Sequence, residues 1–147
     1  MIDAVVEATA VEKPTAVIAE QTTWEEFPRL WRELLAEVWE VVRGNDAIAP
    51  GRNVMFYRDD LPSVEVGAEA AGPFEPIGRV VPGVLPAGRV ARTTLRGAYD
   101  GIGAAHAAVI DWCDRHGLVR AGPRWEIYGH WTPDEAQQEV EIFYLLR

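Results

Sequence analysis

The segment RWEIYGHW (residues 124–131) holds the residues of this chain that are best suited to chemistry, because it places a carboxylate among aromatic rings. In an extended strand side chains alternate between faces, so Glu126, Tyr128 and His130 share one face and Trp125 lies on the other. An acid in this position is either solvated or structurally paired, or it lies in a pocket and acts on a ligand. In a pocket it would pair with a cation, or activate water as a general base with help from the tyrosine.

The other reactive residue types form no recognisable motif. His106 and His116 are ten positions apart, which is not the four-residue spacing of a helical metal site, and His130 stands alone. Cys113 is the single cysteine and is expected to be an inert core thiol. The sequence contains neither a phosphate-binding loop nor a Ser-His-Asp motif. We therefore expect no metal and no cofactor.

Composition narrows the class of protein. The 147 residues are 48% hydrophobic, which suits one globular domain over residues 1–147. The net charge is −9 and the basic residues are dispersed, so direct binding of nucleic acid is not expected and cationic ligands are favoured over anionic ones. The acidic N-terminal segment does not resemble a signal peptide, and no apolar run has the roughly 18 residues of a membrane span. We expect a cytoplasmic protein that does not bind membranes and is a monomer or a homodimer.

Periodicity predicts two helices and several strands in an order that repeats. Residues 25–45 and 100–118 carry apolar residues at helical spacing. β-like segments surround the helices, at residues 4–24, 52–59, 63–69, 78–99, 123–131 and 139–146. Each half of the chain thus reads strand–helix–strand–strand, and GRNVMFY (51–57) aligns with GPRWEIY (122–128). The sequence predicts an α+β fold of two βαββ modules, one over about residues 1–72 and one over about 73–147.

Strand alternation also predicts which residues share a face. We expect Val140, Ile142, Tyr144 and Leu146 to pack on the helices, together with the rows that contain Trp125, Ile127, Val54, Phe56, Val64 and Val66. The opposite face then mixes carboxylates, aromatic rings and a methionine, as a ligand surface does. Its members are Glu126, Tyr128, Glu141, Phe143, Met55, Tyr57 and Glu65.

The order of several short motifs resembles the GyrI-like effector-binding domain family. That family includes gyrase-inhibitory proteins, the ligand-binding domains of some MerR- and AraC-type regulators, and stand-alone small-molecule binders. The matching residues are the TTWEEFPRLW segment, Gly97-Ala98-Tyr99 before a helix, Trp112, Gly117-Leu118, Glu126-Ile127-Tyr128 and Glu141. The resemblance covers nearly the whole chain.

This resemblance implies an antiparallel sheet with the helices on one face, and two modules related by a pseudo-twofold axis with a ligand cleft between them. In multidrug-binding members the glutamate of the Glu-x-Tyr strand pairs with lipophilic cations inside an aromatic cage, a role that falls here on Glu126. A buried carboxylate needs such a partner, and aromatic faces attract cations. The chain would be a stand-alone domain of this kind.

Other residues would line the same cleft. Each of them has an alternative role in packing or ion pairing; for Glu141 the alternative is a salt bridge to an arginine, and for Trp39 and Trp112 it is the core. The candidate ligand contacts beside Glu126 and Tyr128 are Glu141, Phe143, Tyr99, Met55, Tyr57, Trp39, Trp112 and His106.

Three functions remain open at this point. The first is a binding protein for lipophilic aromatic, cationic small molecules. The second is a hydrolase of strained electrophiles, such as cyclopropane-bearing DNA-alkylating natural products, with Glu126 and Tyr128 as catalytic residues. The third is a protein-interaction module that inhibits gyrase. The first two use the same pocket, so the sequence does not separate them.

Overall fold

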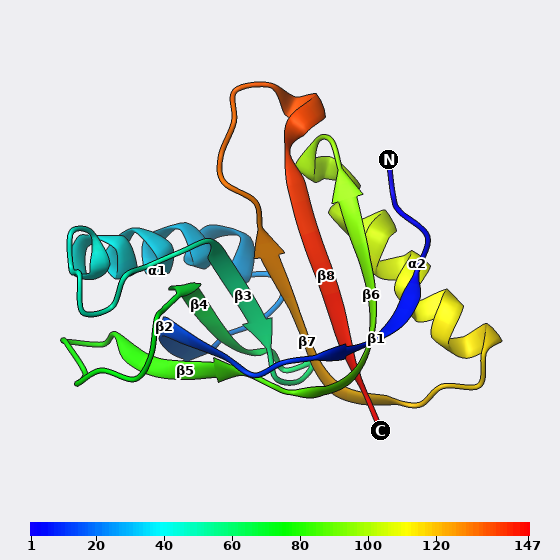
Figure 1. Cartoon of the computed structure of the whole chain (residues 1–147), viewed down its shortest axis with the longest axis horizontal. Helices are drawn as coiled ribbons and strands as arrows, with labels where there is room; N and C mark the ends of the chain where they lie inside the picture. Colours follow the sequence, from blue (N-terminus) through cyan, green and yellow to red (C-terminus); the bar gives the residue numbers. More distant parts are fainter.

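The computed structural model describes residues 1–147 as one eight-stranded antiparallel sheet with two α-helices on one of its faces (Figure 1). The predicted α+β class is therefore correct. The elements are β1 (Val6–Ala10), β2 (Lys13–Gln21), α1 (Phe27–Val42), β3 (Asn53–Tyr57), β4 (Ser63–Glu69), β5 (Val81–Leu85), β6 (Gly88–Arg96), α2 (Ile102–Arg115), β7 (Arg120–Tyr128) and β8 (Glu139–Leu146), with short 3₁₀ turns at Tyr99–Gly101 and Glu135–Gln137.

The strand order across the sheet is β1-β6-β8-β7-β3-β4-β2-β5. Strands β2, β3 and β4 of the first half and β6, β7 and β8 of the second half form two blocks, which meet where β3 pairs with β7. The outermost strands are exchanged, because β1 pairs with β6 and β5 pairs with β2. Each predicted half therefore contributes one strand to the edge of the other half, which local sequence patterns do not reveal.

Each helix covers its own block of strands. Helix α1 packs on β2 and β4, and α2 packs on β6 and β8, at opposite ends of the sheet (Figure 1). The apolar stripe of α1 buries Leu34, Val38 and Val42. Helix α2 buries Ala105, Val109 and Cys113, which are spaced four residues apart. Neither helix combines the length and apolarity needed to cross a lipid bilayer. The central strands β3 and β7 are left between the two helices.

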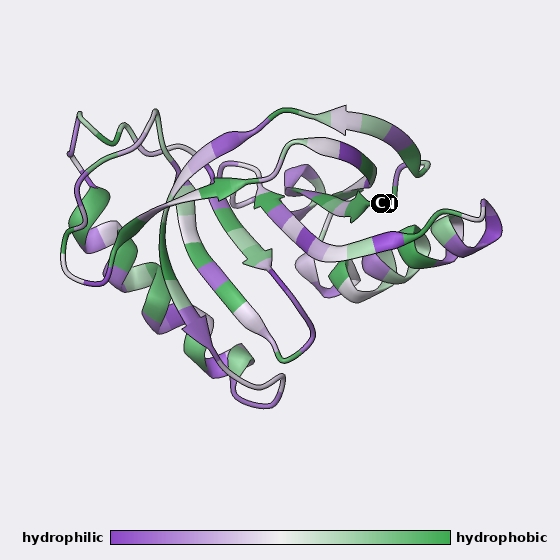
Figure 2. Cartoon of the chain, turned by 90° about the horizontal axis from the view of Figure 1, so that it is seen from below, coloured by the Kyte–Doolittle hydropathy of each residue, from purple (hydrophilic) through white to green (hydrophobic).

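The centre of the sheet is buried on both faces. Val54, Phe56, Trp125 and Ile127 form a core on the face that carries no helix, together with Phe143. The prediction that these β3 and β7 residues pack on the helices is thus wrong, whereas the rows of β4 and β8 are correctly placed. Hydrophobic and hydrophilic bands alternate along the strands (Figure 2). In β3 and β7 the apolar row points away from the helices, and only the pairing register determines this.

Candidate functional site

A hollow of about 280 Å³ lies over the central strands, at the inner side of α2. It combines one acid, one imidazole and one guanidinium with three aromatic rings. Its lining residues are Trp24, Tyr57, Gly103, His106, Arg124, Glu126 and Tyr144. The hollow lies on the helix-bearing face, because Glu126 pairs directly with Ile142 of the α2 core and with Met55 of the α1 core.

Glu126 is the acid of this hollow, and its side chain is only 3% exposed. Oε1 accepts hydrogen bonds from the Tyr57 hydroxyl at 3.0 Å and from the Tyr128 hydroxyl at 2.7 Å. Oε2 lies 2.6 Å from Nε2 of His106. These bonds satisfy the carboxylate, but none comes from a lysine or an arginine. Glu126 is therefore buried without a permanently charged partner.

His106 links Glu126 to a third tyrosine. Its Nδ1 lies 2.6 Å from the Tyr144 hydroxyl. A neutral imidazole meets both contacts by donating from Nε2 to Glu126 and accepting from Tyr144 at Nδ1. His106 follows the buried Ala105 in α2, so its ring reaches over β7 and β8 from the edge of the helix stripe. The arrangement can hold, accept or pass on a proton at Glu126.

Strand pairing explains how the two halves build this cluster. Met55 of β3 lies directly opposite Glu126 of β7. Tyr57 and Tyr128 each follow two positions later on the same face, so both hydroxyls reach Oε1 of Glu126. Both hydroxyls also approach the Met55 sulfur, at 3.8 Å and 3.9 Å. The sulfur and the carboxylate thus form the floor between two phenol rings.

Burial and the nearby carboxylate keep the tyrosines protonated. Burial, followed by the charge of Glu126, raises the pKa values of Tyr57 and Tyr128 well above the usual range. Burial is also the main cause that raises the pKa of Tyr144, to about 12. Each phenol therefore remains a hydrogen-bond donor at neutral pH.

Trp24 and Arg124 form the mouth of the hollow. The Arg124 guanidinium carbon lies 5.7 Å from the ring centroids of both Trp24 and Tyr57. The same guanidinium pairs with Asp60 at 2.7 Å. Trp24 as a whole residue is 48% exposed, so the mouth is accessible from solvent.

The structure brings together most of the residues that the sequence singled out. Met55, Tyr57, His106, Glu126 and Tyr128 form the contacts described above. Tyr99 does not bond Glu126 but contacts Tyr128, with the two rings edge to face and 5.7 Å between their centroids. Whether these residues contact a ligand remains a prediction.

Four candidates lie elsewhere. Phe143 stacks on Trp125 at 5.5 Å, and Glu141 pairs with Arg52 at 3.0 Å, both on the face without helices. The expectation that these two share a face with Glu126 is wrong, because they lie opposite Trp125 and Ile127 in the β7–β8 pairing. Glu65, predicted on that face too, lies opposite Phe56 in the β3–β4 pairing and is likewise on the face without helices. The remaining two candidates are tryptophans of the helices. Trp39 of α1 donates a hydrogen bond to Asn53 Oδ1 at 2.7 Å, and Trp112 of α2 stacks on His116 at the end of the same helix.

Three residues that line the hollow were not predicted from the sequence. For Arg124 a signal was available, because it has the same strand parity as Glu126 and therefore lies on the same face. Trp24 belongs to the segment before α1 that carries the family resemblance. Tyr144 was assigned to the helix-packed row, and only its pairing with Arg124 places it beside the acid.

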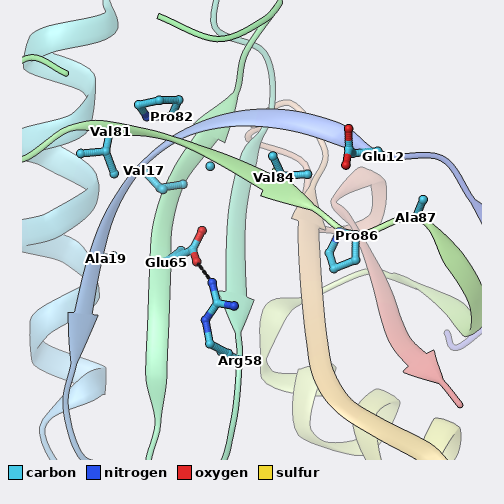
Figure 3. A pocket seen from close by; sticks show the side chains of 11 residues that line it. Glu12, Val17, Ala19, Arg58, Glu65, Val81, Pro82, Val84, Pro86 and Ala87 are labelled. Atoms are coloured by element: carbon cyan, nitrogen blue, oxygen red, sulfur yellow. Dashed lines mark hydrogen bonds and ion pairs between the residues drawn. The ribbon is translucent and has the colours of Figure 1, made fainter. Parts of the chain in front are cut away.

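A larger hollow, of about 570 Å³, lies on the face without helices (Figure 3). Val17, Pro82 and the ion pair between Arg58 and Glu65 line it, together with neighbouring residues of β2 and β5. It is an open depression without a buried reactive cluster, so size alone does not identify the reactive site. No three His, Cys, Asp or Glu side chains gather closely enough to hold a metal ion.

Comparison with known proteins agrees with this geometry. A model of the GyrI-like small molecule binding domain matches residues 9–147. Among curated proteins, no sequence matches significantly. The C-terminal domain of EcmrR has a similar structure, with 19% identity, a TM-score of 0.77, and coverage of 97% of this chain and 96% of that one. This chain spans 57% of the EcmrR chain in its complex with DNA.

Two further structures have the same fold. SAV2435 bound to tetraphenylphosphonium is 11% identical, with a TM-score of 0.73 and coverage of 97% of this chain and 93% of that chain. A hydrolase from Listeria innocua is 10% identical, with a TM-score of 0.60 and coverage of 97% and 91%. At such identities the likeness demonstrates the fold alone.

Proposed function

The chain belongs to the GyrI-like small molecule binding domain family, and we propose that it binds lipophilic aromatic cations at Glu126. One observation carries this proposal. The Glu126 carboxylate is 3% exposed and bonded only to phenols and an imidazole. A buried carboxylate without a fixed cation favours a ligand that supplies the positive charge.

The surroundings of Glu126 favour a flat or aromatic cation over a small hydrated ion. Trp24 and Tyr57 offer ring faces at the mouth, each of which attracts a cation by about 0.5–2 kcal/mol. A delocalised cation is cheaper to desolvate than an ammonium ion, and its apolar groups can replace water in the hollow. Tetraphenylphosphonium, to which the structural relative SAV2435 is bound, is an example of such a ligand on this fold.

The test is a titration with tetraphenylphosphonium, followed by tryptophan fluorescence. Glu126→Gln removes the charge but keeps the shape and one acceptor oxygen, so we expect binding to weaken about tenfold or more. Glu65→Gln is the matched control, because Glu65 is also largely buried but lies on the other face, beside Arg58. Equal affinity in the wild type and Glu126→Gln would overturn the role of the charge.

Hydrolysis is the second candidate, and the contact between Glu126 and His106 at 2.6 Å favours it. A carboxylate joined to an imidazole can take a proton from water, while a phenol such as Tyr128 donates to the leaving atom. In a strained ring the water oxygen would bond to one carbon as the carbon–carbon bond breaks. The released electron pair would leave with the other carbon and its conjugated acceptor atom, which takes the proton from the phenol, and the proton that Glu126 took from water would return to the phenol. The test is mass spectrometry of a cyclopropane-bearing alkylating compound after incubation. Product formation lost in Glu126→Gln, with binding retained, supports an enzyme, and an unchanged compound contradicts it.

A further inference from the structure

We propose that Arg124 is an internal cation that occupies the aromatic mouth of the site and must be displaced when a cationic ligand binds. This inference deepens the proposed function and rests on it. It makes Arg124, with its partner Asp60, the residue that decides which cations enter.

Arg124 already has the contacts that a ligand cation would make. Strand pairing places it opposite Tyr57 on one side and Tyr144 on the other. Its guanidinium carbon lies 5.7 Å from the centroids of Trp24 and Tyr57, while those two rings are 5.7 Å apart. A guanidinium in this position satisfies the same ring faces that attract a foreign cation.

Asp60 holds Arg124 in place from the solvent side. The carboxylate of Asp60 pairs with Arg124 at 2.7 Å, and its side chain is 88% exposed. The indole N–H of Trp24 donates to the backbone carbonyl of Asp60 at 3.1 Å, which keeps the loop next to the mouth. An ion pair with one exposed partner contributes little stability, so Arg124 can leave both the rings and the Asp60 carboxylate at small cost.

Arg124 also separates two hollows. The Glu126 hollow measures about 280 Å³, and a neighbouring one measures about 530 Å³. The second hollow is lined by apolar side chains such as Ile110 and Leu118 and by the charged side chains of Asp60, Asp114 and Arg120. Arg124 and Tyr144 line both. Pockets that bind drug-sized ligands measure roughly 300–1,000 Å³. The Glu126 hollow alone lies at the lower end of this range. Withdrawal of Arg124 would join it to the second hollow, whose lining is both apolar and charged.

This arrangement selects among ligands. A large aromatic cation replaces the guanidinium at the rings, gains the Glu126 charge and fills the joined space. A neutral molecule of the same shape displaces Arg124 without restoring the lost interaction with the rings. A small cation does not reach the second hollow. The site therefore favours cations that are both delocalised and bulky.

The test compares Arg124→Gln with the wild type in titrations with tetraphenylphosphonium. Removing the internal competitor is expected to tighten binding about tenfold, since two ring contacts and an exposed ion pair no longer oppose the ligand. Arg58→Gln is the matched control, because Arg58 also lies over a ring, Phe56, and pairs with an acid, Glu65, but on the other face. That variant changes the net charge equally and is expected to leave affinity unchanged.

A second variant and a second probe complete the test. Asp60→Asn, at an exposed position, is expected to tighten binding about twofold by freeing Arg124. Tetraphenylborate, which has the same shape and the opposite charge, is expected to bind the wild type more weakly than tetraphenylphosphonium. Equal or weaker phosphonium binding by both Arg124→Gln and Asp60→Asn, while the wild type binds through Glu126, would overturn the inference and leave the proposed function standing. Absence of phosphonium binding by wild type and both variants would overturn both.

Discussion

At the scale of single residues, the site depends on one carboxylate whose burial the fold does not need. Met55 occupies the position directly opposite Glu126 in the neighbouring strand, so a thioether fills the equivalent place without difficulty. Burying a carboxylate costs several kcal/mol, which the hydrogen bonds from Tyr57, Tyr128 and His106 offset only in part. The burial of Glu126 therefore supports the proposal that this residue serves a ligand.

The tyrosines around Glu126 lead to a prediction at alkaline pH. Tyr57, Tyr128 and Tyr144 have raised pKa values in the folded chain, chiefly because they are buried. A phenol in the unfolded chain ionises near pH 10, so these groups stabilise the fold fully below about pH 10 and progressively less above it. At about pH 11 we expect the ultraviolet phenolate signal of the folded protein to lack these three residues. Simultaneous ionisation of all four tyrosines of the chain near pH 10, without unfolding, would contradict this burial.

At the scale of elements, Arg52 fastens the junction of the two halves. It precedes β3 and bonds Glu69 at the end of β4, at 3.0 Å, and Glu141 of β8, also at 3.0 Å. Burial alone would raise the pKa of Glu69, but the hydrogen bonds from Arg52 and Lys13 outweigh it and lower the value to about 2. The arginine thus joins strands from both halves on the face opposite the site.

Arg52→Gln is expected to lower the free energy of unfolding by about 1–3 kcal/mol at neutral pH, because charge-assisted hydrogen bonds are lost. The depressed pKa of Glu69 gives stability that is present above about pH 4.5 and is lost as the pH falls towards about 2. The difference between wild type and variant should shrink over that interval, as measured by denaturant unfolding at several pH values. Arg79→Gln is the control, since Arg79 also binds two acids, Glu37 and Glu20, but at the surface. A similar loss in both variants would contradict the role of Arg52.

The helices and the two strands that follow each of them were predictable because their signals are local. The single β-like segment predicted before each helix is two strands in the structure, so each half is ββαββ and not βαββ. The stripe at Leu34 and Val38 repeats at helical spacing, and the pair Glu126 and Tyr128 follows from strand alternation. The faces of β3 and β7 were not predictable, because Trp125 and Ile127 are as apolar as a helix-packed row and the sheet is buried on both sides there. Burial on both faces removes the contrast that alternation needs.

The rest of the site depends on contacts between distant parts of the chain. Tyr144 reaches His106 only because β8 pairs with β7 in one particular register. Arg124 had the right parity, but a charged residue beside a loop is usually solvated, and only the positions of Trp24 and Tyr57 reveal its aromatic surroundings. The exchange of β1 and β5 between the halves likewise has no local signal.

At the scale of the whole molecule, the proposed ligand site lies at the junction of the halves. Strands β3 and β7 carry the cluster on one face and a shared core of Val54, Phe56, Trp125 and Ile127 on the other. Neither half buries this core alone. We therefore expect the chain to unfold in a single cooperative transition.

Ligand binding at this junction should stabilise the whole chain. Tetraphenylphosphonium at about one hundred times its dissociation constant is expected to add about 2.7 kcal/mol. For a domain of this size the midpoint temperature then rises by about 5–10 °C, which calorimetry measures. Two separate transitions, of which the ligand moves only one, would show that the halves unfold independently.

The location of the ligand is the most direct test, and a crystal structure of the complex with tetraphenylphosphonium provides it. We expect the phosphonium to face the Glu126 carboxylate, with phenyl groups on Trp24 and Tyr57 and with Arg124 displaced from both rings. A phosphonium bound instead in the hollow of the opposite face, between Val17 and Pro82 (Figure 3), with the Glu126 cluster unchanged, would contradict the proposed site.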